Sequence, residues 1–224
     1  FDGAYWRQCD TAHEFPWDFY KSFAEAGWLG IAIPEAYGGA GLGITEASIL
    51  LEEVSASGAA MNGATALHLN IFGMQPVVKH GSEALKADTL PRIVNGDLHV
   101  CFGVTEPGAG LDTTRITTFA KRDGDHYVVN GRKVWISKAV ESEKVLLLTR
   151  TTKFDDVDKK TQGLTLFLTD LDRDHIDIRP IKKMGRNAVT SNELFIDNLR
   201  IPVEDRVGEE GQGFRYILDG LNPE

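Results

Sequence analysis

Residues 126–137 read HYVVNGRKVWIS and are rich in the β-branched and aromatic side chains that favour strands. The dipeptide Asn130-Gly131 lies in the middle of this stretch, and Asp123-Gly124 lies just before it. Both dipeptides are typical of two-residue hairpin turns, and the signal at Asn130-Gly131 is the clearer. The preceding apolar run at residues 99–104, HVCFGV, has the length of a strand. The sequence therefore predicts a β region that begins near residue 99.

Further apolar runs predict strands at residues 144–149, 164–169, 176–181 and 193–196. The residues before 99 instead show the helical repeat of three and four residues. This repeat predicts helices over residues 16–26, 62–79 and 82–95, and one that opens at Thr45 and ends before Gly58. No strand alternates with a helix long enough for a crossover connection. Helices first and strands afterwards predict an α+β fold.

This order divides the chain into three segments. We expect a helical N-terminal domain over residues 1–97 and a β middle domain over residues 98–210. The remaining segment, residues 211–224, reads as the start of a helix that the sequence does not complete. Because residue 1 is also Phe, we expect a truncated piece of a longer protein.

Composition limits the classes of function. The 224 residues carry 24 Lys and Arg against 33 Asp and Glu, a net charge of −9, so no basic field attracts a nucleic acid. No stretch approaches the ~20 apolar residues of a membrane span. The two cysteines, Cys9 and Cys101, are too few for a disulfide framework or a thiolate metal cluster. We expect a soluble protein of a reducing compartment.

Several motifs of common binding sites are incomplete. The glycine-rich residues 38–43 follow no predicted strand, and Ile44 occupies the third glycine position of a dinucleotide loop, so we interpret them as a connector. Asp170, Asp172 and Asp174 imitate a calcium loop whose later glycine and glutamate are missing. The six histidines form no pair at metal-ligand spacing, and no G-x-S-x-G motif occurs. No metal site is predicted.

Two segments of the β region remain as candidate sites. Residues 102–112 read FGVTEPGAGLD, in which a strand ends and two glycines allow the backbone to approach a ligand closely. A turn that merely joins two strands is the alternative. Trp135 and Ser137 are two residues apart, which places them on one face of a strand. Trp135 is either a ligand-facing ring or a core aromatic.

The order and spacing of these motifs resemble the acyl-CoA dehydrogenase family, and the resemblance spans nearly the whole chain. In the β region it rests on VTEPGAG at residues 104–110, on residues 124–137, on MGR at residues 184–186 and on RIPV at residues 200–203. In the helical region it rests on AGWLG at residues 26–30, and on residues 34–35, 38–41, 52–53, 90–92 and 96–97.

The resemblance implies a fold and a cofactor. It implies a helical N-terminal domain, an antiparallel β-barrel-like middle domain and a C-terminal four-helix domain, of which only the start near residue 213 is present. FAD would lie between the middle and C-terminal domains. Thr105 would bond the pyrimidine edge of the flavin, Trp135 would pack against the ring, and Ser137 would bond near N5. The complete set of implied cofactor contacts is Phe102, Val104, Thr105, Gly110, Leu111, Trp135, Ile136 and Ser137.

The resemblance also implies a reaction, the α,β-dehydrogenation of an acyl-CoA thioester with hydride transfer to flavin N5. The family's catalytic base is a Glu of the C-terminal domain, so no catalytic residue is assigned in this chain. Glu106 is interpreted as a structural carboxylate. Substrate contacts are implied for Leu111 and for the region of Phe72 and Met74, two side chains that are otherwise buried core. Implied partners are an electron-transfer flavoprotein and identical subunits, as a homodimer or homotetramer, in a bacterial cytoplasm or a mitochondrial matrix.

Three positions depart from the family pattern. Leu111 and Val189 replace serines, and Lys138 replaces an asparagine. These departures leave open a family-like flavoprotein or scaffold that does not dehydrogenate. An acyl-CoA oxidase and a nitroalkane-type flavoprotein are further alternatives.

Overall fold

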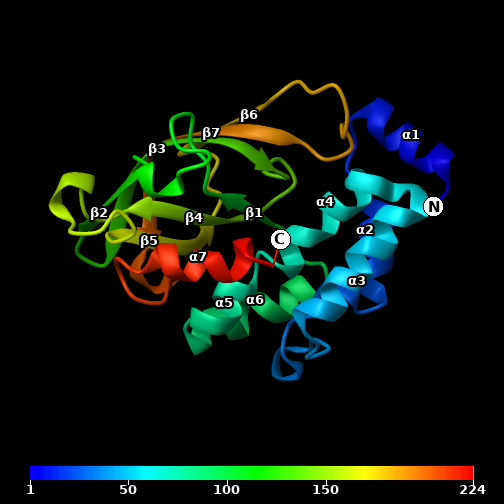
Figure 1. Cartoon of the computed structure of the whole chain (residues 1–224), viewed down its shortest axis with the longest axis horizontal. Helices are drawn as coiled ribbons and strands as arrows, with labels where there is room; N and C mark the ends of the chain where they lie inside the picture. Colours follow the sequence, from blue (N-terminus) through cyan, green and yellow to red (C-terminus); the bar gives the residue numbers. More distant parts are fainter. Residues whose placement is uncertain (224) are drawn as a thin grey trace.

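Helices fill one side of the molecule and a single sheet fills the other, as Figure 1 shows for the computed structural model, which describes residues 1–223. This arrangement confirms the predicted α+β fold. The helices are α1 (Gly3–Ala12), α2 (Trp17–Glu25), α3 (Ile44–Val54), α4 (Ala60–Ile71), α5 (Gln75–His80), α6 (Glu83–Val94) and α7 (Gly213–Leu221). The strands are β1 (Val100–Gly103), β2 (Phe119–Asp123), β3 (His126–Ser137), β4 (Lys144–Arg150), β5 (Leu164–Asp170), β6 (Ile176–Pro180), β7 (Ser191–Pro202) and β8 (Arg206–Val207).

The first helix, α1, has no counterpart in the prediction. Asp2 caps it, because its carboxylate accepts hydrogen bonds from the backbone N–H groups of Ala4 and Tyr5, both at 3.0 Å. Trp6 and Cys9 are the buried side chains of this helix. With so few buried positions, its hydrophobic repeat is too short to be recognised in the sequence.

The single helix predicted over residues 62–79 is wrong, since the structure contains two helices, α4 and α5, separated by residues 72–74. Pro76 explains the break. Its ring nitrogen carries no hydrogen for the carbonyl of Phe72, and the ring would collide with that carbonyl in a continuous helix. The chain therefore turns after Phe72 and restarts with Pro76 in the first turn of α5.

The strands form one mixed sheet. Its order is β6-β7-β3-β2-β4-β5-β8, and β1 pairs with β4. The pairs β1–β4 and β2–β4 are parallel, and the other pairs are antiparallel. Side chains from β1 through β7 meet in one core, which agrees with the barrel-like expectation. A second core joins β4 and β5 to α5, α6 and α7, and a third fills the helical half.

The hairpin predicted at Asn130-Gly131 is wrong, because both residues lie inside β3. The side-chain oxygen of Asn130 accepts a 2.9 Å hydrogen bond from the backbone N–H of Asn198 on β7. At this point β7 carries one extra residue and forms a bulge, with Asn198 in the left-handed region at φ 52°. The turn at Asp123-Gly124 is confirmed and joins β2 to β3.

Helix α7 packs on α5 and on the sheet (Figure 1). Asp219 accepts a hydrogen bond from Lys79 Nζ at 2.5 Å and lies 2.7 Å from His80 Nε2. The ring of Tyr216 stacks on His80 with centroids 4.2 Å apart. At Gly220 a Cβ atom would lie 3.2 Å from the carbonyl oxygen of Phe72, so the bare backbone lets α7 pass close to the break between α4 and α5.

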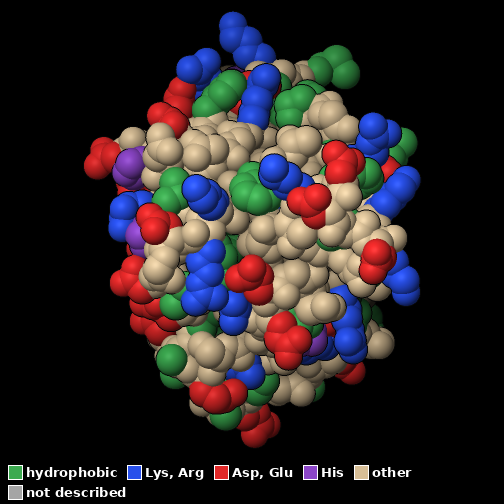
Figure 2. Space-filling view, turned by 90° about the vertical axis from the view of Figure 1, so that its left-hand side faces the viewer, with side chains coloured by type: hydrophobic (Ala, Val, Ile, Leu, Met, Phe, Trp, Pro, Cys, Tyr) green, Lys and Arg blue, Asp and Glu red, His purple; other side chains and the backbone are tan. Residues whose placement is uncertain are grey.

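Figure 2 shows acidic and basic side chains interspersed over the face in view. Among residues 1–223, no helix combines the length and apolar character that a bilayer crossing needs. Over the same residues, no group of three or more His, Cys, Asp or Glu side chains is arranged to hold a metal ion.

The close approach of β3 to the segment before β2 generates a prediction. A Cβ atom at Gly131 would lie 2.3 Å from Thr118 Oγ1 and 2.7 Å from Thr118 Cα. We expect Gly131→Ala to lower the free energy of unfolding by about 3 kcal/mol, because the backbone at Thr118 would have to move away from the new methyl group. Gly185→Ala is the control, because no atom lies within 4 Å of its Cβ position. Urea unfolding measures both variants, and equal stabilities would contradict the expectation.

Candidate functional site

The segment after β1 is held by a buried ion pair. Lys133 Nζ lies 2.9 Å from Glu106 Oε1, and both side chains are buried. The same ammonium donates to the carbonyl oxygens of Val104, at 3.0 Å, and Leu148, at 2.7 Å. Lys133 on β3 therefore ties the end of β1 to the neighbouring strand β4.

The carboxylate of Glu106 has no capacity left for acid–base chemistry. It accepts hydrogen bonds from the backbone and hydroxyl of Thr117 and from the backbone of Thr118, besides the contact with Lys133. Burial alone would raise the pKa of Glu106, but the charge of Lys133 and these hydrogen bonds hold it below its ordinary value. Burial lowers the pKa of Lys133 to about 8, against the opposing effect of Glu106. These contacts agree with the interpretation of Glu106 as a structural carboxylate.

The loop beyond the ion pair is open. Cβ atoms added at Gly108 or Gly110 would have no atom within 4 Å, and the side chain of Leu111 is fully exposed. An exposed leucine beside bare backbone offers an apolar contact and lets an incoming molecule approach the chain closely. Glu106 and Ala109 close a hydrogen-bonded turn with Ala109 buried, and the glycines on either side of Ala109 leave room for a ligand to approach.

Trp135 is not a core aromatic, because 61% of its surface is exposed. It has φ 63°, a left-handed conformation that costs about 1–3 kcal/mol in a residue other than glycine. Between Lys133 and Ile136, β3 carries one more residue than β7, and this bulge interrupts the simple alternation assumed for Trp135 and Ser137. Trp135 thus combines an exposed ring with a strained backbone, a combination that is typical of residues at binding sites.

The other residues that the resemblance implies as cofactor contacts differ in how far they are buried. Ile136 is buried in the core of the sheet, so only its backbone can meet a cofactor. Val104 is buried against the helices, and Phe102 is half-buried, with Gly73 and Gly220 close to its ring. Thr105 and Ser137 are also half-buried. Trp135, Leu111 and Gly110 are the exposed members of the set.

Arg186 links Ser137 to the helical half. Its Nη1 donates to Thr65 Oγ1 on α4, at 3.2 Å, and lies 3.5 Å from Ser137 Oγ. Its Nη2 donates to Ser191 Oγ at 2.8 Å. Neither Arg186 nor Thr65 was among the residues selected from the sequence. The motif MGR contained Arg186, but only the fold brings it to Ser137.

A groove of about 420 Å³ opens beside this contact, between α3, the turn after it and α4. Its lining residues are Ser48, Leu51, Glu52, Ser55, Met61, Ala64, Thr65, His68, Phe72 and Pro223. Phe72 thus belongs to the groove as well as to the helical core. Met74 does not, because it is fully buried between the sheet and α5 to α7.

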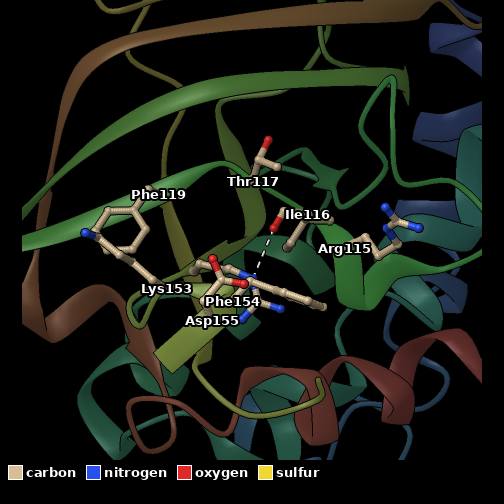
Figure 3. A pocket seen from close by; sticks show the side chains of 8 residues that line it. Arg115, Ile116, Thr117, Phe119, Lys153, Phe154 and Asp155 are labelled. Carbon is tan, nitrogen blue, oxygen red and sulfur yellow. Dashed lines mark hydrogen bonds between the residues drawn. The ribbon is translucent and has the colours of Figure 1, made fainter. Parts of the chain in front are cut away.

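A second hollow, of about 450 Å³, was not predicted at all. Figure 3 shows it between the segment before β2 and the loop after β4, lined by Arg115, Ile116, Thr117, Phe119, Arg150, Lys153, Phe154 and Asp155. The buried Arg150 organises it by donating to the carbonyl of Ile116 at 3.2 Å, dashed in Figure 3, and by facing the ring of Phe154 at 4.9 Å. The only sequence feature that could have indicated this hollow is Arg150, the charged residue that ends the mostly apolar run KVLLLTR.

Lys138, one of the three departures, is fully buried and has φ 63°. Its ammonium donates to Asn70 Oδ1 at 2.7 Å and lies 5.6 Å from the centre of the Tyr20 ring. Asn70 in turn donates to Tyr20 Oη at 2.7 Å. The lysine therefore reaches out of the sheet half into the helical half, from the residue directly after Ser137.

Val189 and Leu111 have separate explanations. Val189 is fully buried among the aromatic and aliphatic side chains of the helical core, where a serine hydroxyl would lose its water. The departure at Val189 thus belongs to packing between the two halves. The departure at Leu111 stays on the surface, where it changes the character of the open loop.

The buried ion pair generates a prediction. We expect Glu106→Gln to cost about 3–5 kcal/mol of folding free energy, because Lys133 keeps a buried and unpaired charge. Adding Lys133→Met removes that charge, so the double variant should be more stable than Glu106→Gln alone. A double-mutant cycle by urea unfolding measures the coupling. Strictly additive losses would show that the two groups do not interact.

Lys138 generates a pH prediction. Burial lowers its pKa from 10.5 to about 8, so between these pH values the unfolded chain binds a proton that the folded chain has released. Folding stability from this group therefore rises with pH over that window. We expect wild type to gain about 1–3 kcal/mol relative to Lys138→Met between pH 7.5 and pH 10. Parallel urea titrations measure the difference, and a constant difference would refute the assignment.

Comparison with known proteins agrees with this geometry. The model of the acyl-CoA dehydrogenase N-terminal domain matches residues 4–97, and that of the middle domain matches residues 101–199. Glutaryl-CoA dehydrogenase of Desulfococcus multivorans is 32% identical over 221 residues, which are 96% of this chain and 55% of that protein. The mitochondrial short-chain specific acyl-CoA dehydrogenase of Rattus norvegicus is 32% identical over 216 residues, 96% of this chain and 51% of that protein.

Solved structures give the same result. A glutaryl-CoA dehydrogenase in complex with glutaryl-CoA has a TM-score of 0.87 at 32% identity, over 96% of this chain and 54% of that one. The prolyl acyl carrier protein oxidase AnaB has a TM-score of 0.89 at 26% identity, over 99% of this chain and 57% of that one. The chain spans about half the length of the relatives it matches. It belongs to the acyl-CoA dehydrogenase family.

Proposed function

We propose that the protein to which this chain belongs is an FAD-dependent acyl-CoA dehydrogenase. The observation that carries the proposal is the strained and exposed Trp135 beside Ser137. An isoalloxazine ring needs an apolar plane and a few directed hydrogen bonds, and these two side chains supply both. The open loop at Gly108 and Gly110 leaves room for the remainder of the cofactor. The residues present therefore fit FAD.

FAD, when bound, supplies an acceptor for the hydride from the substrate β-carbon. The chain's own residues bind and orient. With FAD bound, Trp135 would pack on the ring, Ser137 would bond near N5, and Thr105, which follows the strand fixed by Lys133, would meet the pyrimidine edge. The family resemblance implies that the base that removes the α-proton is a Glu of the C-terminal domain, and Glu106 is not proposed for this role because its carboxylate is fully engaged. We assign no catalytic residue within the chain.

The two hollows suit the two ends of an acyl-CoA. The groove beside Phe72 and Thr65 is the proposed site of the acyl chain, since it lies next to the contact between Arg186 and Ser137. The basic hollow follows Leu111 after a single short turn, Thr113–Arg115. Its aromatic rings and its cations at Arg115 and Lys153 suit the phosphorylated nucleotide end of CoA.

Reoxidation and assembly belong to the same proposal. We assign reoxidation to an electron-transfer flavoprotein and expect a homodimer or homotetramer, in a bacterial cytoplasm or a mitochondrial matrix. The domain limits proposed are residues 1–97 and 98–210, with α7 opening the following helical domain. An oxidase is the second candidate, because AnaB, named an oxidase, has a TM-score of 0.89. Peroxide formation in the absence of an artificial acceptor distinguishes the oxidase from the dehydrogenase.

The test uses the full-length protein that contains this chain. We expect it to bind FAD, and anaerobic addition of a short-chain acyl-CoA to bleach the flavin absorbance. Trp135→Ala should weaken FAD binding at least tenfold by removing the packing plane. The matched control is Trp28→Ala, an exposed tryptophan of the helical half, which should bind as wild type does. A full-length protein that takes up no FAD on reconstitution would end the proposal.

A further inference from the structure

We propose that Arg186 sets the reduction potential of the bound flavin, as a fixed positive charge one hydroxyl away from the reactive edge. The inference rests on the proposed function, which places Ser137 at flavin N5. Its own evidence is the surroundings of the guanidinium, in which hydroxyl groups stand where several other arginines have carboxylates.

The charge of Arg186 is not neutralised by a carboxylate. Its guanidinium is partly buried, and its hydrogen-bond partners are three hydroxyl oxygens, on Thr65, Ser137 and Ser191. Within residues 1–223 no Asp or Glu oxygen forms an ion pair with it. By contrast, Arg132 pairs with Glu193 at 2.8 Å, and Arg179 and Arg206 also have carboxylate partners. Hydroxyl groups are neutral, so the positive charge at Arg186 persists.

The segment that carries Arg186 is fixed from several sides. Lys183 Nζ donates to the carbonyl oxygens of Arg186 and Val189, at 2.8 and 2.5 Å. Asp10 on α1 accepts from the backbone N–H of Asn187 at 2.6 Å. Arg186 itself has φ 58°, a strained conformation that these contacts maintain. A charge held this rigidly acts on its surroundings without the reorganisation that a mobile side chain would need.

A second cation, Lys183, lies on the same segment as Arg186. Burial, together with the charge of Arg186, lowers the pKa of Lys183 to about 8, against the opposing effects of Asp10 and Glu141. Below that pH, Lys183 is a second cation on the segment that carries Arg186, where the carboxylates of Asp10 and Glu141 partly offset its charge. Two-electron reduction places additional electron density on the flavin, and a nearby positive charge in a partly buried site favours that state.

The substitution that tests this inference removes the charge and keeps polarity. We expect Arg186→Gln to make flavin reduction at least tenfold less favourable, a fall in midpoint potential of about 30 mV for a two-electron couple. Arg186→Lys keeps the charge and should retain most of the wild-type potential. Arg200→Gln, on an exposed position of β7, changes the net charge equally and should leave the potential unchanged.

The measurement is the midpoint potential of the full-length protein, by equilibration with a reference dye, alongside the FAD dissociation constant. A midpoint for Arg186→Gln equal to that of wild type would overturn the inference, as would an equal fall in Arg200→Gln. Arg186→Met is a second neutral variant with the same expected fall. If both neutral variants fail to fold, Arg186 is structural and the inference is wrong. If the wild-type protein binds no FAD, the proposed function is contradicted instead. The FAD dissociation constant of wild type shows this before any variant is compared.

Discussion

The ion pair between Lys133 and Glu106 is the constraint on which the site depends. A buried lysine ammonium needs a hydrogen-bond acceptor for each of its three N–H groups. Here the acceptors are the carboxylate of Glu106 and the backbone carbonyls of Val104 and Leu148. The ends of β1 and β4 are therefore fixed relative to β3. Thr105 and the open glycine loop follow β1 in the chain, and Trp135 lies two residues after Lys133 on β3. Two segments distant in sequence are thus held in one geometry by a single charged group.

Much of the fold follows from the sequence because its signals are local. The change from helical to strand spacing near residue 99 and the turn at Asp123-Gly124 are set by neighbouring residues, and both agree with the structure. The errors arise where distant contacts decide. Asn130-Gly131 has turn chemistry, but pairing with the bulge at Asn198 keeps it within a strand. Likewise, the break before α5 depends on one proline that a strong apolar repeat obscures.

The candidate site shows the same division. Trp135 and Ser137 were identified from their motif, yet the bulge that exposes the tryptophan could not be read from spacing. Arg186 contacts Ser137 across 49 positions of sequence. Arg150 donates to carbonyls of two other segments, before β2 and before β5. Side chains of this kind carry no local pattern. Two departures from the family pattern, Lys138 and Val189, are explained by what they touch in the opposite half.

The docking of α7 has a mechanical consequence. The chain begins in the helical half, passes through the whole sheet, and returns at α7 to grip α5 through Asp219, Lys79 and His80. The return contact thus adds to the covalent connection after α6 and to the contacts that Lys138, Arg186 and Val189 make with the helical half. These contacts oppose a hinge motion between the two halves. The two halves should therefore unfold together as one cooperative unit, and the slow hydrogen exchange of backbone amides in β4 and β5 should depend on α7.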